Sequence, residues 1–164
     1  MEILKVENLR KEYGEGNSEV VALDGVDLTI ERGEFVAIVG PSGSGKSTLL
    51  HIIGGVDSPS EGKVYIEGND ISQYTSKELA FFRRRKVGLI YQFYNLIQNL
   101  TVRHNIEPPL KLDKRKINEE ILLDTVRKLG IESKLDSFPS ELSGGQQQRV
   151  AIARYYLQTI NNPS

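Results

Sequence analysis

Cysteine is missing from this 164-residue chain, and so is any long apolar run. Without cysteine the chain can form neither a disulfide framework nor a thiolate metal site. The longest apolar run covers only residues 35–39, whereas a membrane-spanning helix needs roughly 20 residues. The first residues lack the apolar stretch and the small-residue cleavage site of a signal peptide. We therefore expect any role at a membrane to depend on a partner.

A surplus of one charge sign is also missing. The formal net charge is −1, so nothing directs the whole chain toward nucleic acid or an anionic membrane. Hydrophobic residues make up 38% and charged residues 26% of the chain, as in an ordinary globular protein. A chain of this length can form one domain with a buried core.

Short stretches in the first part of the chain have the patterns of strands. Residues 3–6 and 26–30 alternate apolar and polar side chains, which predicts half-exposed strands. Residues 35–39 are continuously apolar and predict a strand buried on both faces. Residues 62–68 predict a short strand between turns, and residues 87–91 predict another buried strand.

Helical patterns lie between these strands and dominate the second part. We expect helices at residues 46–53 and 76–86, a third that Asn118 caps, and a fourth over residues 143–157. The chain is therefore predicted to be a single α/β domain over residues 1–164. Its α/β core covers residues 1–100, and a mainly helical subdomain covers residues 101–157.

The strongest motif follows the predicted strand at residues 35–39. It fits G-x-x-x-x-G-K-[ST], in which glycines allow a tight turn and successive backbone N–H groups form a nest for phosphate oxygens. The helix that follows adds its positive end, and the lysine adds a point charge for the β- and γ-phosphates. The serine hydroxyl can ligate Mg²⁺. The predicted nucleotide loop consists of Gly40, Pro41, Ser42, Gly43, Ser44, Gly45, Lys46, Ser47 and Thr48.

A second motif lies at the start of the last predicted helix. Ser143 can cap this helix, and Gln146, three residues later, can complete a capping box. Gly144 and Gly145 then expose backbone N–H groups at the positive end of the helix. The simpler interpretation is a capped helix start that binds nothing.

The two motifs together resemble those of ATP-binding-cassette (ABC) proteins, and the resemblance covers essentially the whole chain. Residues 142–146 are similar to the LSGGQ signature, and residues 40–47 to the phosphate loop, or Walker A motif, of the P-loop NTPases. The resemblance implies the ABC-type P-loop fold, a mixed sheet with an antiparallel part and an inserted helical subdomain. It also implies ATP and Mg²⁺ as ligands and ATP hydrolysis as the activity of the family.

Family positions outside the motifs are carried over by resemblance alone. Gln92 resembles the glutamine that contacts Mg²⁺ or the attacking water, so Ser47 and Gln92 are the expected metal contacts. Tyr13 resembles the aromatic residue that stacks on adenine. The four signature residues are expected to act in trans, on the nucleotide of a second domain in a head-to-tail dimer. Those four are Ser143, Gly144, Gly145 and Gln146.

The segments at residues 21–26, 82–88 and 94–97 resemble those of lipoprotein-releasing, macrolide-export and antimicrobial-peptide-resistance ATPases. That resemblance implies a membrane permease as partner, contacted by residues 101–112, and a cytoplasmic location at the inner face of the membrane. Nucleic acid is not an expected partner. The basic run at residues 83–86 is interpreted as a solvated helix face, with permease contact as the alternative.

The sequence also departs from the family pattern. No apolar run in it ends in the Asp-Glu pair that orders Mg²⁺ and polarises water, and no histidine lies late enough to contact the γ-phosphate. His51, in a predicted helix, and His104, in a predicted loop, are interpreted as structural or surface residues. The stretch at residues 155–160 is about three residues longer than its counterpart in members of the family, which indicates either an aberrant end or an extended helix. We therefore expect the C-terminal part of the core to be missing, with reduced stability and little or no ATP turnover by this chain.

Two other functions remain open. A non-hydrolysing ABC fragment would lack the same Asp-Glu pair. An ABC ATPase of DNA repair would carry a coiled-coil or zinc-binding insertion between the two motifs, and residues 92–142 show neither sustained heptads nor cysteine. The transported substrate, the direction of transport and the choice between homodimer and heterodimer are not encoded in these patterns.

Overall fold

The computed structural model describes residues 1–112, 114 and 116–160. The chain divides into two compact units, Met1–Arg83 and Arg84–Ser164, which we call the sheet unit and the helical unit. The boundary lies in the last turns of helix α2 (Ser76–Arg85). Each unit is considered separately below.

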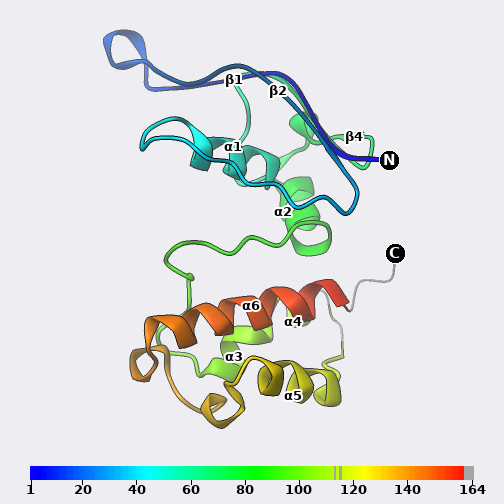
Figure 1. Ribbon diagram of the computed structural model, residues 1–164, viewed down its shortest axis with the longest axis vertical. Helices are drawn as coiled ribbons and strands as arrows, with labels where there is room; N and C mark the ends of the chain where they lie inside the picture. Colours follow the sequence, from blue (N-terminus) through cyan, green and yellow to red (C-terminus); the bar gives the residue numbers. More distant parts are fainter. Residues whose placement is uncertain (113, 115, 161–164) are drawn as a thin grey trace. The chain divides into compact units, whose positions relative to one another are not determined.

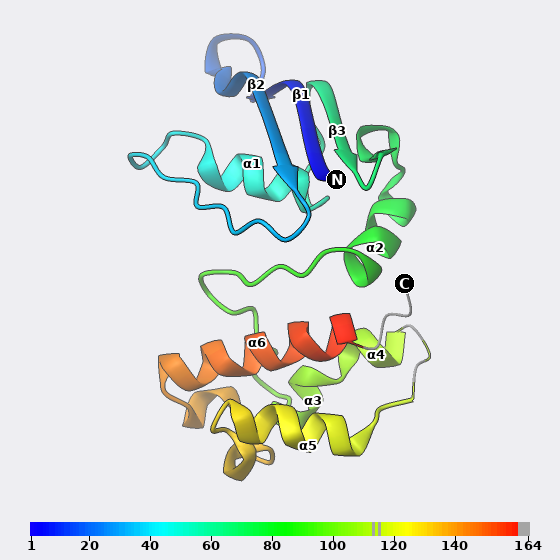
Figure 2. The ribbon, with the colours of Figure 1, turned by 45° about the vertical axis from the view of Figure 1, so that its right-hand side comes forward.

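The sheet unit is built around a long antiparallel hairpin. Strands β1 (Glu2–Tyr13) and β2 (Val20–Glu31) pair antiparallel, and β1 also pairs with β3 (Glu61–Ile66). The short strand β4 (Asn69–Asp70) completes a four-stranded sheet of order β2-β1-β3-β4, most of which can be followed in Figure 2. The expected strands at residues 3–6 and 26–30 therefore form, and both are longer than predicted.

Helix α1 (Lys46–Ile53) covers one face of this sheet. Its buried side chains, Leu49 and Ile52, share the core with strand residues such as Leu9 and Val64, each almost fully buried. Leu79 and Phe82 of α2 complete that core. The helix has the predicted bounds. Gly45, in a left-handed conformation, precedes it, and Gly54, in a right-handed helical conformation, follows it.

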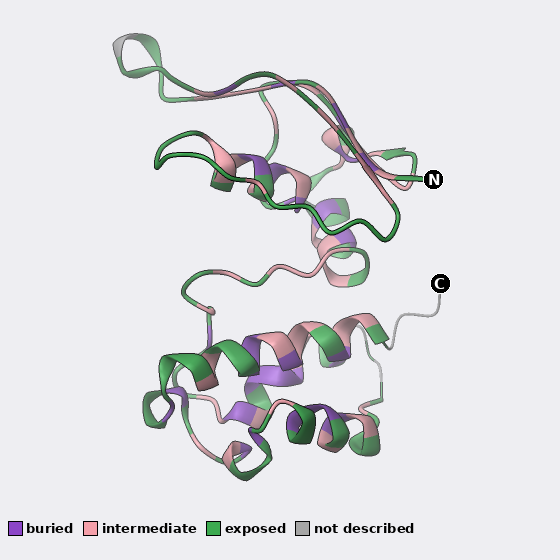
Figure 3. Ribbon diagram, in the orientation of Figure 1, coloured by how far each residue is buried: buried purple, intermediate pink, exposed green. Residues whose placement is uncertain are grey.

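The predicted buried strand at residues 35–39 is wrong for this structure. Those residues take no strand conformation, Phe35 is 99% exposed and Val39 is 86% exposed, and Figure 3 shows the path between β2 and α1 mainly in green. A strand persists only when neighbouring strands satisfy its N–H and C=O groups. Among the described residues, the strands all belong to the antiparallel sheet, and none of them pairs with this segment.

The helical unit forms its own core. Helices α3 (Val102–Ile106), α4 (Pro108–Leu112), α5 (Glu119–Lys128) and α6 (Gly144–Ile160) make up this unit (Figure 1), and each contributes buried apolar residues to one cluster. Asn118 caps α5 as predicted, because its side chain accepts a hydrogen bond from the Ile121 N–H at 3.2 Å. Short 3₁₀ turns at Glu132–Lys134 and Pro139–Glu141 connect α5 to α6. The buried cluster includes Val102, Ile106, Leu110, Leu122, Val126, Val150 and Leu157.

Two details of this unit differ from the predictions. Residues 87–91 form no strand, as at residues 35–39, and Ile90 is 44% exposed. His104 lies in α3 instead of a loop. Helix α6 runs on to Ile160, in agreement with the extended-helix interpretation of residues 155–160.

Candidate nucleotide-binding site

The phosphate-loop motif forms a turn that leads directly into α1. The Ser44 N–H bonds the Pro41 carbonyl at 3.4 Å, and the Leu49 N–H bonds the Gly45 carbonyl at 2.9 Å as the helix begins. Gly43 and Gly45 have φ of 81° and 82°, which side chains rarely allow. A Cβ at Gly45 would collide with the Ala22 carbonyl of β2, so this glycine lets the loop approach the sheet closely.

Lys46 folds back over the loop. Its Nζ donates to the carbonyls of Gly40 at 2.9 Å and Pro41 at 2.5 Å, and to Ser44 Oγ at 3.2 Å. The positive charge therefore lies among the atoms of the loop, at the N-terminal end of α1, where the helix dipole already favours an anion. The Ser47 side chain is exposed beside it. The loop thus supplies backbone N–H groups, one ammonium and one hydroxyl, which are the groups that a Mg²⁺-bound phosphate chain requires.

The signature motif forms the predicted capping box. The Ser143 N–H donates to Gln146 Oε1 at 2.8 Å, and the Gln146 N–H donates to Ser143 Oγ at 3.3 Å. Gly144 and Gly145 are exposed, and a Cβ at either would meet nothing within 4 Å. The N-terminal end of α6 therefore carries free space beside its backbone, where a ligand's anionic group can approach.

Tyr13, the last residue of β1, takes part in a polar cluster that sequence reasoning missed. Its hydroxyl donates to Asp57 Oδ2 at 2.7 Å, and Lys11 Nζ donates to Asp57 Oδ1 at 2.9 Å. The Lys11 ammonium lies 4.9 Å from the centroid of the Tyr13 ring. Partial burial acts to raise the pKa of Asp57, but the bonds from Lys11 and Tyr13 outweigh it and the pKa is lowered.

Gln92 lies in an exposed turn of the helical unit, directly after residues 87–91. The next residues, Tyr94 and Asn95, have φ of 58° and 45°. Arg154 of α6 donates to both of their carbonyls, at 2.9 Å for Tyr94 and 3.1 Å for Asn95. Burial lowers the pKa of Arg154. The turn that carries Gln92 is therefore tied to the signature helix.

Comparison with known proteins shows the family of this chain. The profile of the family described as "ABC transporter" matches residues 23–161, which include both motifs. The chain belongs to the ABC transporter family. It is 49% identical over 157 residues to the macrolide export ATP-binding/permease protein MacB 1 of Aeromonas hydrophila subsp. hydrophila. It is 43% identical over 166 aligned residues to the bacitracin export ATP-binding protein BceA of Halalkalibacterium halodurans.

The ABC chain spans only part of these relatives. The MacB 1 match covers 93% of this chain and 24% of the relative, and the BceA match covers 100% of this chain and 64% of the relative. Solved structures of the ATP-binding cassette MJ0796 share its fold. A dimeric post-hydrolysis state bound to ADP and Pi has a TM-score of 0.87 at 42% identity, covering 94% of this chain and 69% of that one. Another dimeric MJ0796 structure has the same TM-score at 43% identity.

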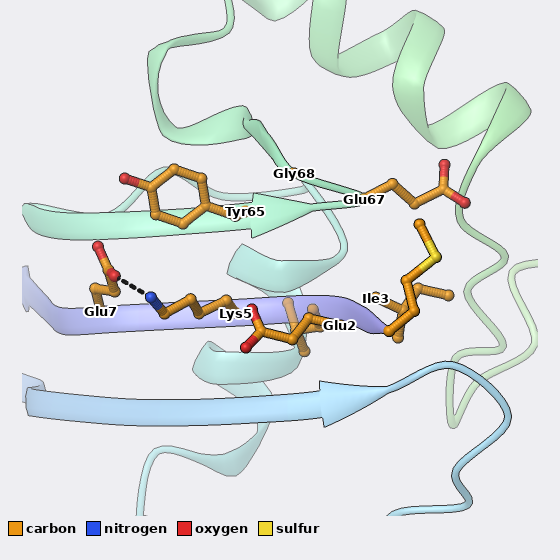
Figure 4. A pocket seen from close by; sticks show the side chains of 9 residues that line it. Glu2, Ile3, Lys5, Glu7, Tyr65, Glu67 and Gly68 are labelled. Carbon is orange, nitrogen blue, oxygen red and sulfur yellow. Dashed lines mark ion pairs between the residues drawn. The ribbon is translucent and has the colours of Figure 1, made fainter.

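Two other features of the ABC chain bear on the site. A pocket of about 430 Å³ lies on the sheet unit, lined by strands β1 and β3 with Lys5, Glu7 and Tyr65 (Figure 4), and none of the predicted nucleotide-binding residues lines it. In the described part of the chain, no helix has the length and hydropathy to cross a membrane.

The two histidines have structural surroundings. The His51 carbonyl accepts the N–H groups of Val56 and Asp57 at the end of α1, at 2.8 and 3.2 Å. His104 Nδ1 lies 2.9 Å from Thr101 Oγ1 at the start of α3. The His51 contacts use only its backbone carbonyl, whereas the His104 contact uses the imidazole ring, and the structural or surface role of both side chains stays a prediction.

Some of the residues that sequence reasoning missed carry a signal in the sequence, and others carry none. Arg154 lies four residues after buried Val150 and three before buried Leu157, so a charged residue on the apolar side of α6 was a usable signal. Lys11 and Asp57 are 46 residues apart and fit no local pattern. Only the fold brings them together.

Proposed function

We propose that this chain binds ATP-Mg through residues 40–48 and works as the nucleotide-binding part of an ABC transporter. The observation that carries the proposal is the Lys46 ammonium, held by three oxygens of a loop at the N-terminal end of α1. This arrangement concentrates positive charge and N–H donors where the phosphates of a nucleotide can bind. Tyr13 supplies the surface on which adenine stacks.

Mg²⁺ is proposed to bind with the nucleotide. The exposed Ser47 hydroxyl is a hard oxygen ligand at the phosphate end of the loop, and the exposed Gln92 amide is the second expected contact. Mg²⁺ keeps several waters and shares phosphate oxygens, so a few protein ligands suffice. The bound ion would neutralise charge on the terminal phosphates.

The signature residues are proposed to act on the nucleotide of a second cassette. Ser143 and Gln146 hold the start of α6, and Gly144 and Gly145 leave their backbone groups accessible. The solved MJ0796 cassettes are described as dimeric, which supports a head-to-tail pair here. In such a pair the α6 N-terminus would meet the γ-phosphate held by the partner.

The proposed physiological role is to couple ATP binding to transport by a membrane permease at the inner face of the membrane. The relatives named as macrolide and bacitracin export proteins support an export role. Hydrolysis is the general activity of the family. The 164 residues contain no strand-ending Asp-Glu pair, so we expect these residues alone to bind ATP with little or no turnover.

The decisive test is Lys46→Ala in the chain of residues 1–164, with ATP-Mg affinity measured by calorimetry. Loss of a charge-assisted contact to phosphate is expected to weaken binding by about 10- to 100-fold. Lys77→Ala on the exposed face of α2 is the matched control and should leave affinity unchanged. Unchanged affinity in a folded Lys46→Ala protein would refute the proposed function.

A further inference from the structure

We propose that Asp57 and Lys11 are positioning residues that hold the Tyr13 ring in place for the adenine of ATP. The inference rests on the proposed function and adds the residues that prepare the base-stacking surface. Asp57 and Lys11 act through Tyr13 and need no contact with the nucleotide. All three residues belong to the sheet unit, as does the phosphate loop.

The Asp57 carboxylate uses both oxygens to organise this cluster. Oδ1 accepts from Lys11 Nζ at 2.9 Å and from the Ser58 N–H at 2.7 Å, while Oδ2 accepts from the Tyr13 hydroxyl at 2.7 Å. A tyrosine that donates to a fixed carboxylate loses much of its freedom to rotate about χ1 and χ2. The ring is therefore held from its hydroxyl end.

Lys11 restrains the same ring from one of its faces. Its Nζ lies 4.9 Å from the ring centroid and also donates to the Ser58 carbonyl at 2.7 Å. Only 13% of the Lys11 side chain is exposed, so the ammonium is partly desolvated and its attraction to the ring is strengthened. Tyr13 itself remains 41% exposed. A cation on one face leaves the other face for a stacking partner.

Helix α1 connects this cluster to the phosphate loop. The Val56 and Asp57 N–H groups bond the His51 carbonyl in the last turn of α1, and Lys46 begins the same eight-residue helix. Eight residues of α-helix span about 12 Å. One rigid element thus fixes the phosphate-binding end and, through Asp57, the orientation of the ring.

A pre-positioned ring lowers the entropic cost of stacking. A free side chain that becomes ordered on binding loses about 0.5–1.5 kcal/mol of affinity, equivalent to about two- to tenfold in Kd. Asp57 and Lys11 restrain Tyr13 before the base arrives. Their contribution should therefore appear only with ligands that carry a base.

The test compares ATP with inorganic tripolyphosphate, which has the phosphates and no base. Kd for each ligand is measured by calorimetry on the full chain and on Tyr13→Ala, Asp57→Ala and Lys11→Met variants. The ratio Kd(ATP)/Kd(tripolyphosphate) removes the effect that any change of protein charge has on anions. Tyr13→Ala should raise the ratio about tenfold, and Asp57→Ala and Lys11→Met about threefold each.

Asp24→Ala is the matched control, because it removes one carboxylate from the same hairpin at a side chain that is 74% exposed. It should leave the ratio unchanged. In a Tyr13→Ala background, Asp57→Ala should add nothing further to the ratio. Far-UV circular dichroism is used to check that each variant is folded. If Asp57→Ala does not fold, the positioning role is tested with Lys11→Met.

The outcomes separate the inference from the proposed function. A ratio unchanged by Asp57→Ala and Lys11→Met, or raised equally when Tyr13 is already alanine, overturns the positioning role and leaves the phosphate site intact. Lys46→Ala should weaken both ligands alike and leave the ratio unchanged. If Lys46→Ala weakens neither ligand, or the unmodified chain binds neither, the proposed function and the positioning role fall together.

Discussion

The two helix starts that carry the motifs are approached by very different stretches of chain. Before α6, Ser143 and Gln146 exchange hydrogen bonds within four residues. Before α1, the apolar residues 35–39 form no strand, and Phe35 is 99% exposed. A helix satisfies its own backbone groups locally, whereas a strand depends on partners far away in the chain. The start of α6 is therefore fixed by residues of its own first turn, whereas α1 follows an apolar segment that pairs with no described strand.

The largest expected effect is on the free energy of unfolding, compared between one variant in each unit. Leu122→Ala removes a side chain that is 0% exposed in the core of the helical unit, and should lower the free energy of unfolding by about 3 kcal/mol. Phe35→Ala removes a larger side chain but should change that free energy by less than about 0.5 kcal/mol. Urea denaturation followed by far-UV circular dichroism measures both. Equal costs would mean that residues 35–39 are buried in solution.

The second prediction concerns the tie between α6 and the turn after Gln92. Arg154→Met leaves the Tyr94 carbonyl without its donor in a part-buried place and the Asn95 carbonyl without its donor in an exposed one, and should cost about 2 kcal/mol of unfolding free energy. Arg149→Met is the control on the same helix, because its bond to the Leu129 carbonyl is exposed. The control should cost less than about 0.5 kcal/mol. If the two variants lost similar stability in thermal unfolding, the Arg154 hydrogen bonds would not be what holds the turn after Gln92 to α6.

Sequence predicted well wherever the interactions were local. The bounds of α1, the Asn118 cap and the Ser143–Gln146 box depend on residues within a few positions of one another. Both motifs of the candidate site were visible for the same reason. Family membership followed from them and is confirmed by the match over residues 23–161.

Sequence predicted less well where distant residues decide. The strands predicted from the apolar patterns at residues 35–39 and 87–91 do not form, and no described strand pairs with either segment. The cluster of Lys11, Tyr13 and Asp57 joins the end of β1 to the turn after α1, and no spacing rule relates them. In both cases, contacts between distant parts of the chain decide the structure, and a local sequence pattern does not report them.

The third prediction tests whether the stability of the α6 start depends only on residues of that start. Ser143→Ala removes the side-chain acceptor of the Gln146 N–H and should cost about 1 kcal/mol. Gln148→Ala, at an exposed position of the same helix, should be nearly neutral. Because the box closes within the helix start, the loss should be the same in a Phe35→Ala background. A different cost there would show that the α6 start depends on residues of the sheet unit.

The last prediction concerns the pH dependence of the long-range cluster, whose expected effect shrinks in acid. The folded-state pKa of Asp57 lies below its ordinary value of 3.8, so its carboxylate stabilises the fold fully above that value. The stabilisation is lost as the pH falls through the lower folded pKa, because protonation weakens the bonds from Lys11 and Tyr13. Asp57→Asn should therefore cost about 1 kcal/mol at neutral pH. That difference should shrink as the pH falls below the ordinary pKa, and a difference that does not change with pH would show that Asp57 acts by packing instead of charge.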